Sequence, residues 1–215
     1  MYNNWRDKHF QVINKFLKYL NERTNEYILK GGTSLLTCYN LDRFSEDIDL
    51  DAKGSRNIKK IIDDFCKENN YTYRIAKDTD IVKRFMINYE TIERPLKIEV
   101  SFRRKNIQDD EITNINGITV YNINEICLMK ASAYSGRDKI RDLYDICFIC
   151  NNFWDGLSED VKKFIRVAVE YKGIEQFEFI IKDQKDELID NNKLEEEFLK
   201  MYDKLGILAP SEDDI

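Results

Sequence analysis

Apolar and polar positions repeat with different periods along the chain and divide it into a mixed first half and a helical second half. Apolar residues at helical spacing predict amphipathic helices over residues 5–22 and 57–68. A shorter helix, residues 33–39, is expected after the doublet Gly31-Gly32. Short apolar or alternating runs predict strands over residues 27–29, 47–52, 71–75, 81–91, 96–102 and 118–121.

From Asn122 onward the pattern is helical, and a second helix of this half is predicted over residues 138–151. Further helices reach about residue 204, and residues 206–215 are expected to form a loose tail. The signals that bound these helices are Asn122 with Glu125, Gly136, Ser158, Gly173 and the acidic segment near Asp183.

This order of elements predicts an α+β fold. We expect a mixed β-sheet core flanked by helices over residues 1–121, with a helical region over residues 122–215 packed on that core. The 215 residues suffice for one domain with a real hydrophobic centre. No apolar run approaches the roughly 20 residues of a membrane helix, and the first residues start no signal peptide, so a cytoplasmic protein without a membrane partner is expected.

The formal net charge of −6 leaves no global positive field to attract nucleic acid. A polyanionic substrate must therefore be held by a local basic patch. The candidates are residues 103–105 and the group of Arg137, Lys139 and Arg141. Solvated surface charge is the alternative explanation for both.

The chain has five cysteines and no secretory signal, so disulfides are not expected. Cys147 and Cys150 have the spacing of half a zinc site, but their apolar helical surroundings favour a core position. The single histidine, His9, excludes an HExxH zinc helix and leaves any histidine-dependent triad resting on one residue. The plentiful carboxylates favour chemistry run by hard cations such as Mg²⁺.

Three acids alternate with aliphatic residues in the predicted strand 47–52. Asp47, Asp49 and Asp51 should project to one face, and Ile48 and Leu50 to the other. Like charges this close destabilise one another unless a cation or a base neutralises them. The alternative is an ordinary surface strand whose acids are solvated.

A further acid, Glu99, lies in the middle of the predicted strand 96–102. If this strand pairs beside the Asp47 strand, three carboxylates converge and can bind two Mg²⁺ ions. That arrangement serves in-line phosphoryl or nucleotidyl transfer. The alternative is a surface ion pair between Lys97 and Glu99.

The turn at Gly31-Gly32 lets backbone N–H groups approach a ligand closely, and Thr33 and Ser34 add hydroxyl groups at the start of a helix. This combination suits phosphate, although it is not a P-loop. An ordinary helix entry is the alternative.

Charged residues also mark the helical half. Asp138, Arg141, Asp142 and Asp145 have the spacing of one helix face. Lys130, on the preceding predicted helix, is surrounded by apolar residues and must reach water or meet an anion. That anion is either a triphosphate or the carboxylate of Asp142 or Asp145.

Together these residues resemble the nucleotidyltransferase superfamily and, more closely, its AbiEii-like toxin family. The superfamily pattern of a glycine doublet, Asp–hydrophobic–Asp and a third acid on a later strand corresponds to Gly31-Gly32, Asp47-Ile48-Asp49 and Glu99. The narrower match consists of KGGTSL at 30–35, RFSEDIDL at 43–50, Lys130, and RDLYD at 141–145. The resemblance spans residues 28 to about 150.

The resemblance implies a nucleotidyltransferase-like fold and a bacterial toxin–antitoxin or abortive-infection toxin. It also implies Mg²⁺ (or Mn²⁺), a nucleoside triphosphate substrate, an RNA acceptor such as tRNA, and a cognate antitoxin. The implied site residues are Asp47 and Asp49 as catalytic metal ligands with Glu99 as a third ligand; Gly31, Gly32, Thr33 and Ser34 as the nucleotide grip; Lys130 as a phosphate contact; Asp142 or Asp145 as a catalytic or positioning acid; and Arg43 and Ser45 as braces.

Two other functions stay open at this point. One is nucleotide transfer to a small molecule, which the negative net charge favours. The other is a catalytically silent module that binds nucleotide or protein.

Overall fold

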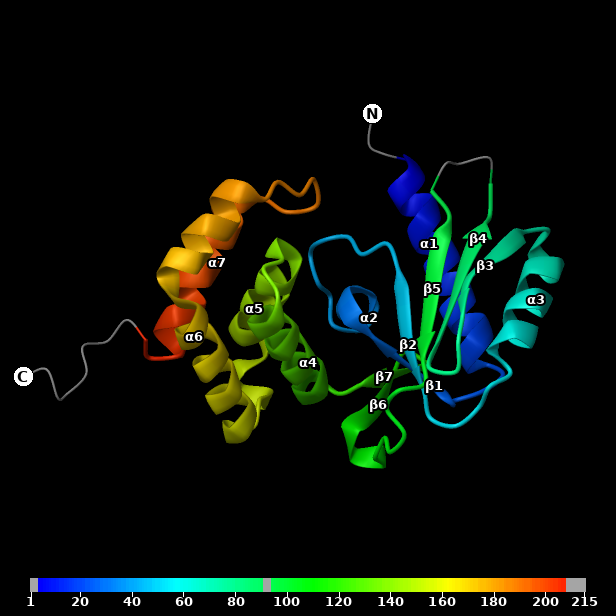
Figure 1. The fold of residues 1–215 in the computed structure, drawn as a ribbon, viewed down its shortest axis with the longest axis horizontal. Helices are drawn as coiled ribbons and strands as arrows, with labels where there is room; N and C mark the ends of the chain where they lie inside the picture. The colour runs from blue at the N-terminus through cyan, green and yellow to red at the C-terminus, as the bar shows by residue number, and fades with distance from the viewer. Residues whose placement is uncertain (1–3, 91–93, 208–215) are drawn as a thin grey trace, which may run out of the picture. The chain divides into compact units, whose positions relative to one another are not determined.

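The computed structural model describes residues 4–90 and 94–207 (Figure 1). They fall into two compact units whose boundary lies between Asn122 and Ile123. The N-terminal unit contains the sheet and the C-terminal unit is helical, so the predicted α+β class is confirmed. The last residue of the predicted strand 81–91 and residues 208–215 of the predicted tail lie outside the described residues.

The N-terminal unit is a seven-stranded mixed sheet with three helices in its described residues. The helices are α1 (Asn4–Asn21), α2 (Gly31–Cys38) and α3 (Ile58–Asn69), with a short 3-10 turn, η1 (Asp109–Glu111). The strands are β1 (Tyr27–Lys30), β2 (Ile48–Ala52), β3 (Thr72–Asp78), β4 (Val82–Asn88), β5 (Leu96–Ser101), β6 (Ile112–Ile115) and β7 (Ile118–Tyr121). Their order across the sheet is β3-β4-β5-β2-β1-β7-β6.

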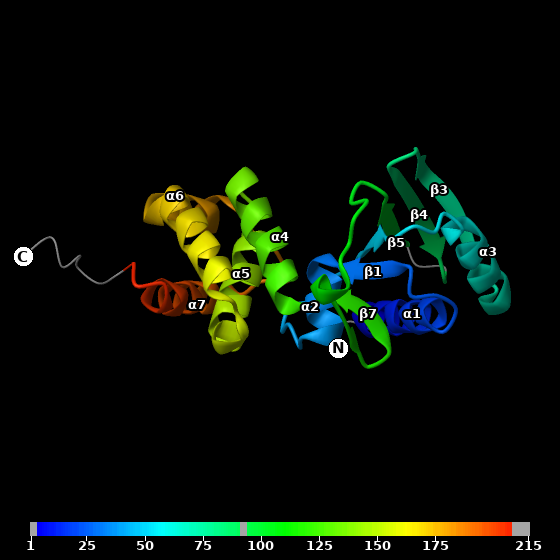
Figure 2. The same ribbon diagram turned by 90° about the horizontal axis from the view of Figure 1, so that it is seen from below.

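Strand β2 lies at the centre of the sheet, antiparallel to β1 and parallel to β5. One face of this region is apolar, because Phe85, Ile87, Ile98 and Val100 are fully buried on it. Helices α1 and α3 lie on that side of β4 and β5 (Figures 1 and 2). The charged positions of β2 and β5 project from the opposite face.

Strand β6 is absent from the prediction, and its sequence shows why. Its four residues, Ile-Thr-Asn-Ile, do not alternate, and all of them are partly or fully exposed at the edge of the sheet. The predicted Asn116-Gly117 turn is present and joins β6 to β7. Both turn residues have positive φ, 53° and 82°, as the tight turn of a hairpin requires.

The C-terminal unit consists of α4 (Ile123–Gly136), α5 (Ile140–Phe153), the 3-10 turn η2 (Trp154–Gly156), α6 (Glu159–Asp183) and α7 (Asn191–Lys204). Helix α4 packs against α5 and α6, and α5 packs against α7. The expected break at Gly173 is present, because its non-helical backbone (φ 69°, ψ 172°) divides α6 into two helical segments that meet at a kink. The side chains of Phe177 and Phe198 stack at 3.6 Å between ring centroids and join α6 to α7.

The cysteine prediction is confirmed, since all five thiols are free. Cys147 and Cys150 are buried in α5, and burial raises the pKa of the Cys150 thiol to about 12. Their place is therefore the core. Among the helices within residues 4–90 and 94–207, none has both the length and the apolar character needed to cross a membrane.

Candidate functional site

The junction of β1 and α2 needs glycine at both positions of the doublet. Gly31 has a φ of 78°, and a Cβ placed on it would lie 3.0 Å from Oδ2 of Asp49. A Cβ on Gly32 would lie 2.8 Å from Oγ of Ser45. The doublet therefore lets the turn approach both the β2 carboxylate and the loop before β2.

Gly32→Ala should destabilise the protein by about 1–3 kcal/mol, because the added methyl group overlaps the Ser45 hydroxyl. Urea unfolding measures this loss. In a Ser45→Ala background the same substitution should cost less, since the closest contact is then gone. An equal cost in both backgrounds would contradict the proposed overlap.

The hydroxyl groups of the turn are engaged within the protein. Thr33 and Ser34 are fully buried. Thr33 donates to Ser45 Oγ at 3.0 Å and to the Asp47 carbonyl oxygen, and Ser34 donates to the Gly31 carbonyl oxygen at 2.7 Å. The two Thr33 bonds hold the turn against the loop that leads into β2, and the Ser34 bond closes the turn itself.

Two predicted braces lie in that loop. Arg43 is buried, and its Nη1 donates to the carbonyl oxygen of Phe44 at 3.1 Å. Ser45 accepts the bond from Thr33 and meets Gly32 closely. Both side chains therefore shape the segment immediately before Asp47.

His9 is a supporting residue that the sequence prediction missed. It is buried, and its ring nitrogens lie 2.7 Å from the Tyr89 hydroxyl and 2.7 Å from the Glu46 carbonyl oxygen. Helix α1 is thereby tied to the residue just before Asp47. Its spacing to Ile13 and Phe16, both fully buried, was the available signal.

The predicted pairing of the two acidic strands is present. Residue Asp49 on β2 lies opposite Glu99 on β5 in the parallel register. Antiparallel register places Arg84 of β4 on the other side of Glu99. Two carboxylates and a basic side chain therefore follow one another in a single row of the sheet.

Most of these carboxylates already have a basic partner. The Asp47 carboxylate pairs with Lys97, and Glu99 pairs with Arg84 at 2.6 Å. The suggested alternative of a Lys97–Glu99 pair is therefore wrong, because the partners on neighbouring strands lie closer than residues two apart on one strand.

Asp51 is separate from this group. It is buried, pairs with Lys30 at 2.6 Å and accepts a hydrogen bond from the Tyr121 hydroxyl at 3.0 Å. These contacts give it a structural place beneath the turn.

Asp49 differs from its neighbours electrostatically. Burial raises the pKa of its carboxyl group above the usual value for aspartate, and the negative charges of Asp47 and Glu99 act in the same direction. Lys97 and Lys30 oppose the shift. Further positive charge beside Asp49 would therefore stabilise its ionised form.

A divalent cation suits the chemistry of these donors, since Asp47, Asp49 and Glu99 offer only oxygen ligands. They are not preassembled for it: the described residues include no group of three acidic, histidine or cysteine side chains arranged to hold a metal. The expected convergence of three carboxylates on a metal is therefore not present among the described residues. The side chains of Asp47 and Glu99 pair with Lys97 and Arg84 instead. Opening these two ion pairs would free both ligands.

The C-terminal unit contains a buried charge cluster of its own. Lys130, whose side chain is 12% exposed, lies 2.7 Å from Asp145 and 3.7 Å from Asp142. Arg137 adds two bonds to Asp142, of 2.6 and 3.1 Å. The anion that Lys130 meets in this structure is thus the carboxylate named as the alternative to triphosphate.

The expected single face of four charged residues is corrected here. Helix α5 starts at Ile140, so Asp138 precedes it and pairs with Lys172 at 2.7 Å. Arg141 points to Asp186, at 2.5 Å. Only Asp142 and Asp145 share the buried side.

The two predicted basic patches are partly engaged in structure. In residues 103–105, Arg104 pairs with Glu111 at 2.7 Å and lies over the Tyr121 ring, whereas its two basic neighbours are exposed. In the other patch, Arg137 and Arg141 hold Asp142 and Asp186.

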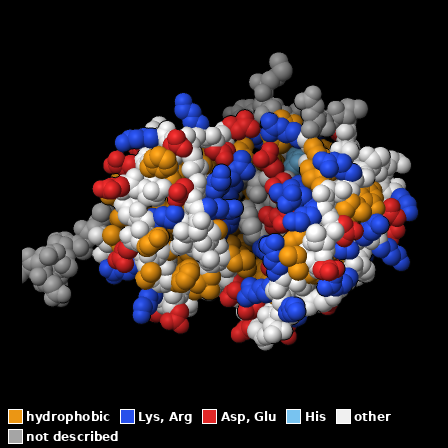
Figure 3. Space-filling model, in the orientation of Figure 1, with side chains coloured by type: hydrophobic (Ala, Val, Ile, Leu, Met, Phe, Trp, Pro, Cys, Tyr) orange, Lys and Arg blue, Asp and Glu red, His pale blue; other side chains and the backbone are white. Residues whose placement is uncertain are grey.

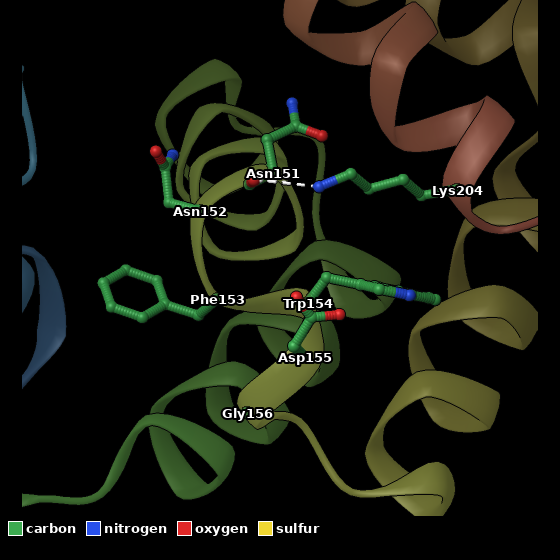
Figure 4. A pocket seen from close by; sticks show the side chains of 7 residues that line it. All are labelled: Asn151, Asn152, Phe153, Trp154, Asp155, Gly156 and Lys204. Atoms are coloured by element: carbon green, nitrogen blue, oxygen red, sulfur yellow. Dashed lines mark hydrogen bonds between the residues drawn. The ribbon is translucent and has the colours of Figure 1, made fainter.

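A hollow of about 430 Å³ in the C-terminal unit is lined by residues 151–156 and Lys204 (Figure 4). Lys204 donates to the carbonyl oxygens of Asn151 and Cys150 at the end of α5. None of the residues predicted to form the site lines this hollow. The ammonium group of Lys204 stabilises the carboxyl end of α5.

Comparisons with known proteins agree with the fold and with the family resemblance. A model of the nucleotidyl transferase AbiEii toxin family, a type IV toxin–antitoxin system, matches residues 15–214. The uncharacterized protein aq_aa25 of Aquifex aeolicus (strain VF5) is 29% identical over 164 residues, which are 74% of this chain and 72% of that protein.

Two solved structures from Helicobacter pylori are similar over nearly the whole chain. JHP933 has a TM-score of 0.79 at 26% identity, covering 95% of this chain and 92% of its own. A candidate nucleotidyltransferase has a TM-score of 0.76 at 25% identity, covering 97% and 100%. The chain belongs to the AbiEii toxin family of type IV toxin–antitoxin systems and is a nucleotidyltransferase.

Proposed function

We propose that this chain is a toxin that transfers a nucleotide from a nucleoside triphosphate to an RNA acceptor, with tRNA as the first candidate. The observation that carries the proposal is the contact between the glycine turn and the β2 carboxylates. The Cβ position of Gly31 lies 3.0 Å from the Asp49 carboxylate. A triphosphate held at the turn would therefore lie beside the acids.

In the proposed reaction the acceptor hydroxyl oxygen forms a bond to the α-phosphorus. The bond from that phosphorus to the bridging oxygen breaks, pyrophosphate leaves, and the hydroxyl proton passes to a carboxylate of the site. Mg²⁺ or Mn²⁺, when bound, neutralises charge on the attacking and leaving oxygens. Asp47 and Asp49 are its proposed ligands, with Glu99 as the third.

The remaining assignments follow from contacts within each unit. Gly31, Gly32, Thr33 and Ser34 shape the proposed phosphate grip, and Arg43 and Ser45 hold the loop before Asp47. In the C-terminal unit, the ion pairs of Asp142 and Asp145 support a positioning role for both acids. A phosphate contact by Lys130 stays a prediction from the family resemblance.

Labelling of total RNA with radioactive nucleoside triphosphates tests the proposal. The wild type should label RNA, and Asp47→Ala and Asp49→Ala should not. Asp80→Ala is the matched control, since Asp80 is an exposed carboxylate of the same unit. Equal labelling by all four proteins would refute the catalytic assignment.

The same variants test the role as a toxin. Expression of the wild type should arrest bacterial growth, while Asp47→Ala and Asp49→Ala should permit it. Coexpression of a cognate antitoxin should restore growth to cells with the wild type. Labelling of small-molecule acceptors in place of RNA would move the function to the first alternative.

A further inference from the structure

The face of the sheet that bears the acids also carries a series of basic residues. Register aligns Lys77 of β3 with Arg84 of β4, Arg84 with Glu99, and Glu99 with Asp49. Residues paired in register project to the same face of a sheet. A charged row therefore runs from the outer strand to the proposed catalytic acid.

A second row lies beside the first. Arg74 is aligned with Met86, and Met86 with Lys97, whose ammonium group pairs with Asp47. The four basic residues Arg74, Lys77, Arg84 and Lys97 are called the basic track below. At about 4.8 Å between strands, the track and the acids together extend over about 14 Å.

An irregularity in β3 brings two of these residues to one face. Arg74 and Lys77 are three positions apart and would lie on opposite faces of a regular strand. The register shifts between Ile75 and Lys77, so Arg74 faces Met86 and Lys77 faces Arg84. Such bulges re-aim side chains and are frequent next to active sites.

The track is open to solvent, whereas the other side of the same strands is buried. Arg74 and Lys77 are exposed, and Arg84 and Lys97 are partly exposed. On the other face Phe85 and Ile98 are fully buried. Figure 3 shows basic side chains beside acidic ones over the region of β2 and β5.

Local charge contrasts with the charge of the whole chain. Strands β3 and β4 hold four basic side chains and one acidic one, and three of the four belong to the track, whereas the complete chain holds 34 basic and 40 acidic side chains. A chain with net charge −6 repels a polyanion in general, so a local concentration of positive charge determines where one binds.

We propose that the basic track is where the phosphate backbone of the RNA acceptor binds as it leads to the carboxylates of Asp47 and Asp49. The inference rests on the proposed function and adds the binding surface. Exposed Arg74 and Lys77 make the first phosphate contacts. Closer to the acids, RNA phosphates form ion pairs with Arg84 and Lys97 and replace the carboxylates of Glu99 and Asp47, which are thereby released.

RNA fits this face better than an acidic protein does. The track ends at the acids, where the acceptor hydroxyl must arrive, and a backbone with regularly spaced phosphates can follow a row of bases. Arginine side chains also stack on unpaired nucleobases. A protein partner needs no such continuity with the reacting groups.

The charge reversal Arg74→Glu with Lys77→Glu tests the track. Fluorescence anisotropy of labelled tRNA, without nucleotide and in an Asp47→Asn background, should show binding weakened roughly 10- to 100-fold. The slope of log affinity against log salt should fall by about 1.4, at about 0.7 per lost single-strand phosphate contact. Thermal melting checks that the variant is folded.

The opposite face of the same hairpin supplies a matched control. Lys59 and Lys60 line a hollow there with Arg56 and Lys83. Lys59→Glu with Lys60→Glu makes the same change in net charge and should leave tRNA binding within about twofold of its parent. Equal weakening by both double variants, or by neither, overturns the proposal.

Failure of the track differs from failure of the proposed function. If wild-type protein labels no RNA while the binding difference persists, the chemistry is wrong and the track stands. If RNA labelling and binding survive the reversal at residues 74 and 77, the track is wrong and the chemistry stands. Loss of antitoxin binding alone in that variant assigns the face to a protein partner and likewise overturns the proposal.

Discussion

Asp49→Asn is expected to lower nucleotide transfer on the order of 10³-fold while raising the melting temperature at neutral pH. The activity falls because the amide offers a weaker ligand to the proposed cation, and a loss of about 4 kcal/mol of transition-state stabilisation corresponds to that factor. The stability rises because an uncharged side chain replaces a carboxylate that burial disfavours.

The pH dependence of this gain has a defined sign. The pKa of Asp49 is raised in the folded state, chiefly by burial, relative to about 3.9 in an unfolded chain. Between these two values the folded protein holds the proton more firmly, so its stability decreases as pH rises through the folded pKa. The advantage of Asp49→Asn should therefore be small near pH 3 and complete once pH exceeds the folded pKa.

Melting temperatures of both proteins from pH 3 to 8, with transfer assays at pH 7, measure the two effects. Asp51→Asn is the matched control, because this neighbouring acid already has Lys30 and Tyr121 as partners. It should lower the melting temperature. A gain for Asp49→Asn that stays constant with pH would contradict the electrostatic explanation.

Asp145→Ala should destabilise the protein by about 3–5 kcal/mol, because it leaves the ammonium group of Lys130 buried without its nearest anion. Both members of this pair are largely removed from water, with exposed side-chain fractions of 12% and 0%. The unfolding free energy from urea titration measures the loss.

Two further variants separate the charge from the packing. Lys130→Met combined with Asp145→Leu replaces the pair by apolar groups and should recover most of the lost stability. Arg166→Ala breaks an exposed pair with Glu170 in the same unit and should cost below about 1 kcal/mol. If Asp145→Ala costs no more than Arg166→Ala, the pair does not anchor Lys130, and a phosphate contact by that lysine gains support.

The sequence predicted every strand of the described sheet except β6, because runs of apolar or alternating residues identify strands locally. In residues 47–52 and 96–102, alternation of apolar and polar positions is enough to identify both strand and face. The glycine doublet likewise signalled a turn, and the close approach of Asp49 and Ser45 explains it. The ion pairs were harder to predict from the sequence, because Lys97–Asp47 and Arg84–Glu99 join residues that are distant along the chain.

The helical half illustrates a different limit. Helical spacing grouped Asp138 and Arg141 with Asp142 and Asp145, but spacing applies only inside a helix and α5 starts at Ile140. The face that Arg141 occupies depends on Asp186, which lies 45 residues later. Partners so distant in sequence leave no periodic signal.

The ion pairs of Asp47 with Lys97 and of Glu99 with Arg84 have a consequence for how the protein matures. Each balances a carboxylate with a charge from the same polypeptide, so the newly made chain needs no imported ion to complete its sheet. Many metalloproteins collapse when a chelator strips them, because their ligands fold only around the metal. If the proposed cation binds at these acids, we therefore expect it to bind after folding, and its removal by a chelator to leave the sheet folded.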